Sequence, residues 1–228
     1  MTEFKGFPKE LPAYFQNLAK NNNKLWFNEH KSDYEDFVKQ PCIDFVSAMG
    51  ERLQVLVPGI NAIPKINQSL FKIHRDVRFS PDKRPYKTNM GLWFWEGKGK
   101  RMECSGFYFH LEKRQILFGA GVYMFPKPLL ERYRNAVVDK KHGKKLPAIV
   151  KNLAKGGYRM GGKHYKKTPR GFDASHPNAE FLLFKGLHAG IEMNIPKVFY
   201  TEKILNLAFE HYKNMLPLHQ WLNEAVVA

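Results

Sequence analysis

Apolar residues near the start of the chain recur at the spacing of a helix. Leu11, Tyr14, Phe15 and Leu18 lie on one helical stripe, which ends at the polar run beginning with Asn21. The same period returns in several later segments. It predicts helices from Leu25 to Pro41, from Pro41 to Pro58, in two segments between Pro126 and Gly156, near Phe181 to Phe184, and from Glu202 onward with a final turn around Leu218 to Val227. Helices are therefore expected at both ends of the chain.

In the middle of the chain the apolar period shortens to two, which predicts β-strands. The expected strands are Ser69–Asp76, Asn89–Glu96, Cys104–Glu112, Gln115–Tyr123 and, later, Leu187–Ile195. Short gaps between successive strands favour antiparallel pairing, because a parallel crossover needs about a dozen residues or more. We therefore expect an α+β fold, in which a mainly antiparallel sheet carries N-terminal and C-terminal helices, built as a single domain over residues 1–228. Residues 158–177 are expected to form a basic, glycine-rich loop.

The composition is typical of a packed globular protein. Hydrophobic residues make up 43% of the 228 residues and include 18 Phe, which is enough for a substantial core. Cys42 and Cys104 lack the paired spacing of a zinc site, so we expect two reduced thiols and no metal. The N-terminus has no apolar region like that of a signal peptide, and no run approaches the roughly 18 apolar residues of a membrane span. We therefore expect a cytoplasmic protein with no membrane partner.

The charge balance points to anionic partners. Lys and Arg number 37 against 21 Asp and Glu, which gives a net charge of +16 and a pI near 9.7. Such a surplus attracts polyanions and anionic substrates, although a widely spread surplus is also typical of general solubility. Seven lysines can form a basic rim for nucleic acid: Lys140, Lys141, Lys144, Lys145, Lys163, Lys166 and Lys167.

The stretch from Phe71 to Asn89 is the most unusual part of the sequence. Strand alternation would place the guanidinium of Arg75 on the same face as the apolar Phe71 and Ile73, where a charge needs a partner. One interpretation is a buried salt bridge that ties the sheet to the helices. The other is an anion site, for which Arg offers bidentate geometry and Lys a point charge. Its expected members are Arg75, Arg78, Lys83, Tyr86 and Lys87.

A second polar stretch runs from Lys166 to Pro177 and contains two prolines and a glycine that restrict its backbone. Arg170, Asp173 and His176 can form a charge and hydrogen-bond cluster there, with Arg170 and His176 as candidate ligand contacts and Asp173 as a candidate acid or base. The alternative is structural: Asp173, Ser175 or His176 caps a helix that begins at Pro177.

His110 is the other candidate for acid and base chemistry, because histidine titrates in the useful range. It shares a strand face with Tyr108, although a lone strand histidine is more often structural. The run Gly119-Ala120-Gly121 permits close approach of a backbone or ligand but lacks the context of a dinucleotide-binding loop. No metal or nucleotide-cofactor motif is found, and the aromatic run Leu92 to Trp95 is interpreted as core.

The two polar stretches resemble those of a widespread group of bacterial and fungal proteins classed as a domain of unknown function. The shared elements are Phe4-Lys5-Gly6-Phe7, Asn22-Asn23 with Trp26-Phe27 and His30, Arg75 to Ser80 with Asp82-Lys83 and Pro85 to Thr88, and Pro169 to Asp173 with His176-Pro177. The resemblance implies one domain with these motifs gathered around a shared site. It implies no activity, cofactor or catalytic residue.

Three functions are therefore open, and the sequence assigns none of them. The first is binding of, or chemistry on, a small phosphorylated or carboxylated ligand in an Arg/Lys-lined pocket, with His110 and Asp173 as candidate acid and base residues. The second is a nucleic-acid-binding domain that uses the basic surface. The third is a structural or protein-interaction domain whose motif residues only hold the fold together.

Overall fold

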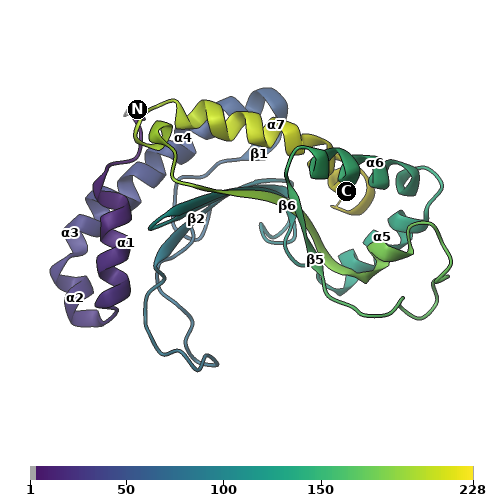
Figure 1. Cartoon of the computed structure of the whole chain (residues 1–228), viewed down its shortest axis with the longest axis horizontal. Coiled ribbons are helices and arrows are strands. Elements are labelled where there is room, and N and C mark those ends of the chain that lie inside the picture. The colour runs from purple at the N-terminus through teal and green to yellow at the C-terminus, as the bar shows by residue number, and fades with distance from the viewer. Residues whose placement is uncertain (1–3, 228) are drawn as a thin grey trace. The chain divides into compact units, whose positions relative to one another are not determined.

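A computed structural model describes residues 4–227 as two compact units (Figure 1). Unit 1 contains the described residues up to Phe94 together with Tyr108–Phe118 and Glu192–Glu210. Unit 2 contains Trp95–Phe107, Gly119–Ile191 and the described residues from His211. The prediction of one domain stays a prediction.

Helices form where the apolar period predicts them at the start of the chain. Helix α1 spans Glu10–Lys20, and α2 spans Lys24–Glu29 after Asn23, whose side chain accepts a hydrogen bond from the Trp26 backbone N–H at 3.0 Å. An asparagine in this position satisfies one of the free N–H groups at the helix start.

The predicted start of the third helix at Pro41 is confirmed to within one residue, but the second helix is not a single segment. The helical run is interrupted at His30 and then continues through α3 (Lys31–Tyr34), a π-helical turn (Glu35–Lys39) and α4 (Gln40–Leu56). Pro41 lies in the first turn of α4, directly after the π turn. Proline is tolerated in a first turn because the N–H that it lacks has no partner within the helix there.

Six strands form one antiparallel sheet in the order β1-β2-β3-β4-β6-β5, so the α+β prediction is confirmed. The strands are β1 (Ile60–Asn61), β2 (Asn89–Glu96), β3 (Gly106–Glu112), β4 (Gln115–Val122), β5 (Arg159–Lys163) and β6 (Phe184–Asn194). The later helices are α5 (Lys127–Val138), α6 (His142–Lys155) and α7 (Ile204–Leu222), with 3₁₀ turns at Ala179–Leu183 and Lys197–Tyr200 and a π turn at Asn223–Val227.

Two strand predictions need correction. The segment Ser69–Asp76 makes only isolated bridges, at Leu70 and His74, because the chain turns back and pairs with its own continuation. Conversely, part of the expected loop 158–177 is strand β5, which pairs with β6 through an irregular register between Gly161 and Lys163. Its glycines interrupt the apolar alternation by which a strand is recognised in a sequence.

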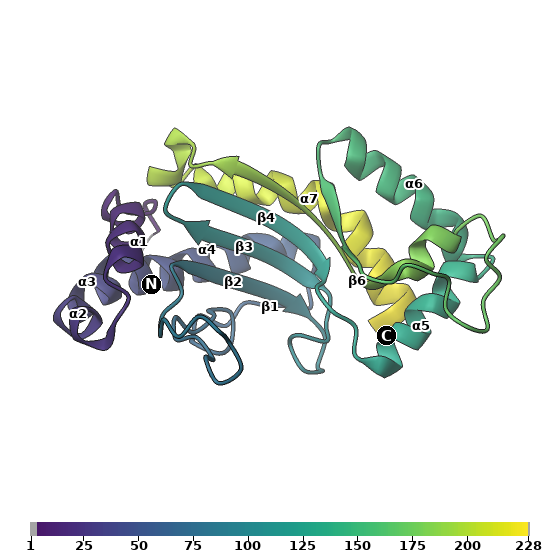
Figure 2. The ribbon, with the colours of Figure 1, turned by 60° about the horizontal axis from the view of Figure 1, so that its bottom comes forward.

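Stacked phenylalanines from distant segments form the core of unit 1. The ring centre of Phe109 in β3 lies 4.8 Å from that of Phe118 in β4 and 4.9 Å from that of Phe45 in α4. The rings of Phe7 and Phe199 stack with their centres 4.6 Å apart. Figures 1 and 2 show α4 lying along one face of the strands. The side chains of Tyr108 and His110 alternate with Phe109 and therefore point to the opposite face. That second face of the unit 1 strands is called the open face below.

In unit 2, polar groups of the helices and turns bond within the core. The Asn178 amide donates to the carbonyls of Val137 at 2.9 Å and Gly143 at 2.8 Å, which end α5 and begin α6. The Tyr133 hydroxyl donates to the Phe181 carbonyl at 2.8 Å, and the Trp221 indole donates to the His142 carbonyl at 2.9 Å. Cys42 in unit 1 and Cys104 in unit 2 are both buried free thiols.

Candidate functional site

Residues 74–86 of the first polar stretch form a hairpin, called the motif hairpin below. Its base is closed by the bridge between His74 and Tyr86 and by the Arg75 N–H, which donates to the Pro85 carbonyl at 2.8 Å. The side chain of Asn22, between α1 and α2, donates to the Tyr86 carbonyl at 2.9 Å and accepts from the Tyr86 N–H at 3.0 Å. Phe27 stacks on the Tyr86 ring at 4.1 Å. The sequence stretches around Asn22 and Tyr86 thus fasten the hairpin to the helices.

The motif hairpin is built from two similar turns in which an aspartate binds an arginine two residues later. Asp76 accepts from the Arg78 backbone N–H at 3.3 Å and from its guanidinium at 2.9 and 2.7 Å. Asp82 does the same for Arg84, with a backbone bond of 3.0 Å and a shortest guanidinium bond of 2.7 Å. The hydrogen bonds from Arg78 hold the pKa of Asp76 down at about 2, and those from Arg84 and Arg75 depress the pKa of Asp82 further. Both carboxylates therefore stay charged at neutral pH.

Arg75 links the two sides of the hairpin. Its guanidinium donates to Asp82 at 2.6 Å and, more weakly, to the Arg84 carbonyl at 3.3 Å and the Ser80 hydroxyl at 3.4 Å. The expectation that Arg75 faces the apolar side of a strand is wrong, because no strand forms there and the partner lies seven residues away in the same loop. Of the two sequence interpretations, the salt bridge is present, but it closes the loop rather than joining sheet to helices.

The remaining residues of the expected anion site lie in different surroundings. The Lys83 ammonium donates to the Val77 carbonyl at 3.0 Å, and Tyr86, at the base of the hairpin, is only 5% exposed. Lys87 follows the hairpin, with its ammonium 5.7 Å from the centre of the Phe71 ring. The cations therefore do not all face one point: Arg75 and Lys83 bond acceptors of the hairpin itself, whereas Lys87 lies beside Phe71.

The second polar stretch lies in unit 2, where two of its residues shape a turn. Asp173 accepts from the Ser175 N–H and hydroxyl, both at 2.8 Å, and these bonds lower the pKa of Asp173. The His176 ring nitrogen accepts from the Asn178 N–H at 3.0 Å. The capping interpretation is wrong, because the helical turn begins at Ala179 rather than Pro177, follows Asn178, and has no side-chain cap. Arg170 is exposed beside Gly171, whose φ of +90° favours glycine.

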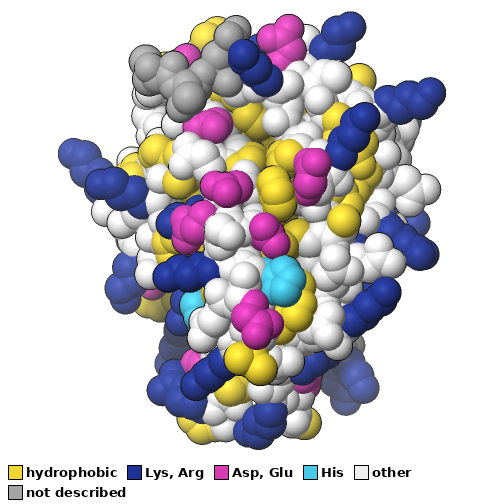
Figure 3. Space-filling view, turned by 90° about the vertical axis from the view of Figure 1, so that its left-hand side faces the viewer, with side chains coloured by type: hydrophobic (Ala, Val, Ile, Leu, Met, Phe, Trp, Pro, Cys, Tyr) yellow, Lys and Arg dark blue, Asp and Glu magenta, His cyan; other side chains and the backbone are white. Residues whose placement is uncertain are grey.

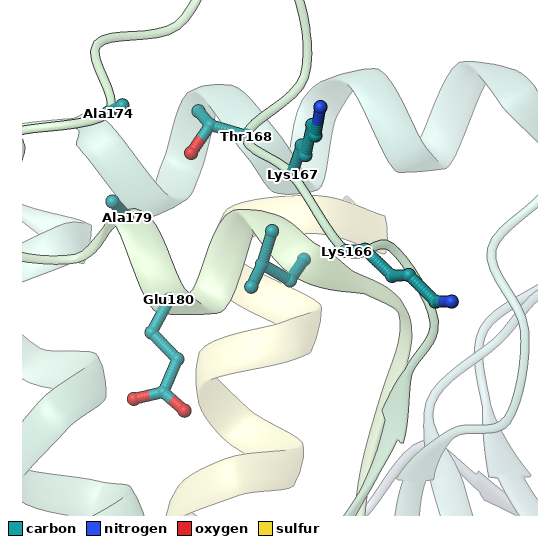
Figure 4. Close-up of a pocket in the computed structure, with 7 residues that line it drawn as sticks. Lys166, Lys167, Thr168, Ala174, Ala179 and Glu180 are labelled. Carbon is teal, nitrogen blue, oxygen red and sulfur yellow. The ribbon is translucent and has the colours of Figure 1, made fainter.

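An open hollow of about 460 Å³ lies beside this stretch (Figure 4). It is lined by Lys166, Lys167, Thr168, Ala174, Ala179, Glu180 and Leu183. Figure 4 shows the Lys166 and Lys167 side chains pointing away from one another, and Glu180 forms an ion pair with Lys163 at 3.0 Å. The hollow therefore lacks the convergent cations that a small anion needs.

The open face of unit 1 carries a tyrosine–histidine pair. The Tyr108 hydroxyl and His110 Nδ1 are 2.9 Å apart, and both side chains are half-buried. Phe71 meets the Tyr108 ring edge-on at 6.1 Å, and Trp93 lies 6.5 Å from it. Gly91 makes room for this arrangement, because a Cβ there would lie 2.6 Å from the Tyr108 hydroxyl. The Tyr108–His110 pair therefore lies beside the rings of Phe71 and Trp93, and the Lys87 ammonium lies 5.7 Å from the centre of the Phe71 ring.

Burial lowers the pKa of His110, although the charges of Glu112 and Glu192 oppose the shift. The imidazole is therefore mainly neutral at pH 7 and keeps one ring nitrogen as a proton acceptor. When the Tyr108 hydroxyl donates to Nδ1, the ring proton sits on Nε2; when Nδ1 donates, Nε2 carries the lone pair. Tyr108 thus supplies the orienting group that the sequence alone did not reveal.

A buried histidine in unit 2 was missed by sequence reasoning. His219 of α7 is fully buried, with Nδ1 2.9 Å from the Ser105 hydroxyl and Nε2 3.0 Å from the Glu96 carboxylate. Asn223 also bonds both His219 and Glu96. The order serine, histidine, carboxylate is that of a hydrolase triad, but Ser105 is 0% exposed and cannot meet a substrate. We interpret the cluster as structural; no local spacing signals it, since 114 residues separate Ser105 and His219.

The expected close approach at Gly119-Ala120-Gly121 is confirmed for Gly121. It has a φ of +127°, and a Cβ there would lie 2.3 Å from the Leu187 carbonyl oxygen of β6. The neighbouring His188 stacks on Tyr123 and covers Gly161, where a Cβ would lie 2.1 Å from its ring. The space beside Gly121 is therefore filled by the backbone of β6, and the space beside Gly161 by the His188 imidazole.

Both polar stretches and the open face fall within one family match. The sequence model of a family described as a conserved hypothetical protein, DUF2461, matches residues 10–221. The chain belongs to the DUF2461 family. No curated protein matches it. The DUF2461 assignment confirms membership of a family of unknown function and names no activity. None of the helices within residues 4–227 of this DUF2461 protein is long and apolar enough to cross a bilayer. Over the same residues, no group of three or more His, Cys, Asp or Glu side chains is arranged to hold a metal ion.

Proposed function

We propose that the protein binds a small ligand with a carboxylate or phosphate group on the open face of unit 1. The observation that carries this proposal is the hydrogen-bonded pair of Tyr108 and His110, half-buried among aromatic rings. Binding sites of small molecules are mostly apolar surfaces with a few precisely placed polar groups, and this face has that composition. The anionic group of the ligand would lie toward Lys87, whose ammonium is held over Phe71.

The pair also supports proton exchange with a bound ligand. A neutral imidazole beside a tyrosine hydroxyl can accept a proton at one nitrogen while the other holds the ring in place. The burial that lowers the pKa of His110 makes the neutral form dominant at pH 7, as a general base requires. Tyr108 would orient the ring, and His110 would be the group that contacts the ligand.

Other cations from the sequence prediction are less suited to this role. The Arg75 guanidinium is engaged by Asp82 and keeps only 24% of its side chain exposed, so an incoming carboxylate would have to compete with an acid already in place. Arg170 and His176 belong to unit 2, and the proposed site does not use them.

A ligand screen tests the proposal. Thermal unfolding of the full chain would be followed against a panel of sugar phosphates, nucleotides and dicarboxylic acids. A ligand at 100 times its Kd stabilises the native state by about 2.7 kcal/mol, which is readily measured as a higher Tm. We expect His110→Gln and Lys87→Met to abolish the shift that the wild type shows, and Tyr108→Phe to weaken it.

The control is a histidine substitution away from the open face. His142→Gln changes a half-buried histidine of unit 2 that pairs with Asp139, and it should leave ligand stabilisation intact. A panel that stabilises wild type and His110→Gln equally would refute the proposed site. So would a panel in which no compound raises the Tm of the wild type.

A further inference from the structure

The motif hairpin presents an aromatic ring to solvent at the tip of a cationic loop. Phe79 is 92% exposed, and the Arg78 guanidinium lies over its ring at 5.8 Å. A large apolar side chain this exposed loses contact with water only when a partner covers it. The Tyr108–His110 pair makes no use of Phe79, so the ring is available to another partner.

Charge indicates the class of partner. Residues 74–86 contain four Lys and Arg against two Asp, and Lys72 and Lys87 flank them. Arg78 keeps 76% of its side chain exposed and Arg84 58%, although each is paired with an aspartate, and Lys83 is exposed as well. The hairpin thus offers an exposed planar ring with one guanidinium over it and further exposed cations in the same loop. Phosphates with attached bases complement both features.

The hairpin is held in shape before any partner arrives. Its two aspartate–arginine turns, the Arg75–Asp82 ion pair and the clamp of Asn22 on Tyr86 fix the loop from inside and at its base. Figures 1 and 2 show it projecting from the rest of unit 1. A rigid, projecting loop loses little conformational entropy on binding, which favours its use as a contact element.

The adjoining face of unit 1 is of mixed charge. Figure 3 shows Asp and Glu side chains in the middle of the face that carries α1 to α3, with Lys and Arg mainly toward its rim. The acidic residues of these helices and the π turn are Glu10, Glu29, Asp33, Glu35 and Asp36. The net charge of +16 therefore does not make this face uniformly basic.

We propose that the motif hairpin binds single-stranded nucleic acid, with a base stacked on Phe79 and phosphates beside Arg78 and Lys83. Stacking needs one exposed ring per base, which the tip supplies. Insertion into an anionic membrane would instead use a larger apolar face, and Phe79 is the one large apolar side chain exposed among residues 74–86. This inference does not depend on the ligand proposed for the open face, because the two sites share no residue.

Fluorescence anisotropy of a labelled oligothymidylate and an oligouridylate with the full chain tests the hairpin. We expect Phe79→Ala to weaken binding roughly 5- to 150-fold, the range that corresponds to loss of one stacked base. Phe79→Trp should bind at least as tightly as the wild type, because it keeps an aromatic plane. Phe79→Leu keeps an apolar side chain without the plane and should bind as weakly as Phe79→Ala.

A charge-matched pair of double variants separates the hairpin from the general basic surface. Arg78→Gln with Lys83→Gln removes two charges from the hairpin, and Lys144→Gln with Lys151→Gln removes two exposed lysines from one side of α6. The slope of log K against log salt should fall by about 1.4 in the hairpin variant, at about 0.7 for each lost phosphate contact. It should stay unchanged in the α6 variant. All substituted side chains are exposed, and the Tm of each variant reports any stability lost with the Arg78–Asp76 pair, so that it is separated from a loss of binding.

Three results would overturn the proposal. Equal losses in the two double variants would mean binding by general surface charge. Wild-type affinity of Phe79→Leu would mean that the tip needs an apolar group rather than a ring. Sedimentation with phosphatidylserine vesicles, lost in Phe79→Ala, without binding of either oligonucleotide would make the hairpin a membrane contact.

Discussion

Removing the side chain of Asn22 should release the motif hairpin from the helices. The change Asn22→Ala deletes two hydrogen bonds, of 2.9 and 3.0 Å, and leaves the N–H and C=O of a buried residue, Tyr86, without these partners. Each lost bond costs about 1 kcal/mol, and an unsatisfied buried group about 1 to 3 kcal/mol. With two such groups left unsatisfied, we expect the free energy of unfolding to fall by about 2 to 6 kcal/mol.

The neighbouring residue provides a matched control. Asn23→Ala removes one capping hydrogen bond at the start of α2 and should cost about 1 kcal/mol. Urea unfolding gives the two free energies, and amide hydrogen exchange shows where they act. Asn22→Ala should speed exchange at Tyr86 and Arg75, whereas Asn23→Ala should speed it at Trp26. Equal costs for the two variants, or an unchanged exchange rate at Tyr86, would refute the clamp.

Three further predictions concern other residues. Gly91→Ala should destabilise unit 1 by about 1 to 3 kcal/mol, because the added Cβ would meet the Tyr108 hydroxyl, and Tyr108→Phe in the same chain should recover part of that loss. Urea unfolding of the two single variants and the double variant measures the coupling between the two positions, and strictly additive free energies would contradict the prediction. Burial lowers the pKa of His219, so the unfolded chain binds more protons; stability should fall as pH drops below about 6.5, and His219→Gln should flatten that fall in pH-dependent calorimetry. The depressed pKa of Asp76 contributes stability above about pH 4 that is lost as pH falls toward 2; nuclear magnetic resonance should show the Asp76 carboxyl titrating near pH 2 in the wild type and near its ordinary pKa in Arg78→Gln.

Local patterns were sufficient to predict the elements whose side chains alternate cleanly. Helix α1 and strand β3 form close to where the apolar period places them, because the period is set by burial on one face. Strand β5 was missed because its residues are glycine-rich and largely polar. The helix start at Pro41 was predictable because proline fits a first helical turn, whereas the π-helical turn before it was not, since sequence spacing does not signal one.

Strand alternation could place two residues of the proposed site on one face but could not give their contacts. His110 and Tyr108 could be placed on one face by alternation, yet their hydrogen bond and the neighbouring Phe71 depend on tertiary packing. Arg75 was recognised as a charge that needs a partner, but the partner depends on the loop folding back on itself. The clamp of Asn22 on Tyr86 spans 64 residues of sequence, and no local rule links such distant positions.

The division of the chain into two units limits how the protein can be cut. Following the chain, the segments alternate between the units, and the path passes from one to the other five times, at residues 94, 107, 118, 191 and 210. Strands β2, β3, β4 and β6 and helix α7 each contain one of these passages. No single cleavage of the backbone can therefore yield one unit as a contiguous fragment. Truncation or fusion at a domain boundary is not a route to isolating either candidate site, and point substitutions in the full chain are the appropriate tool.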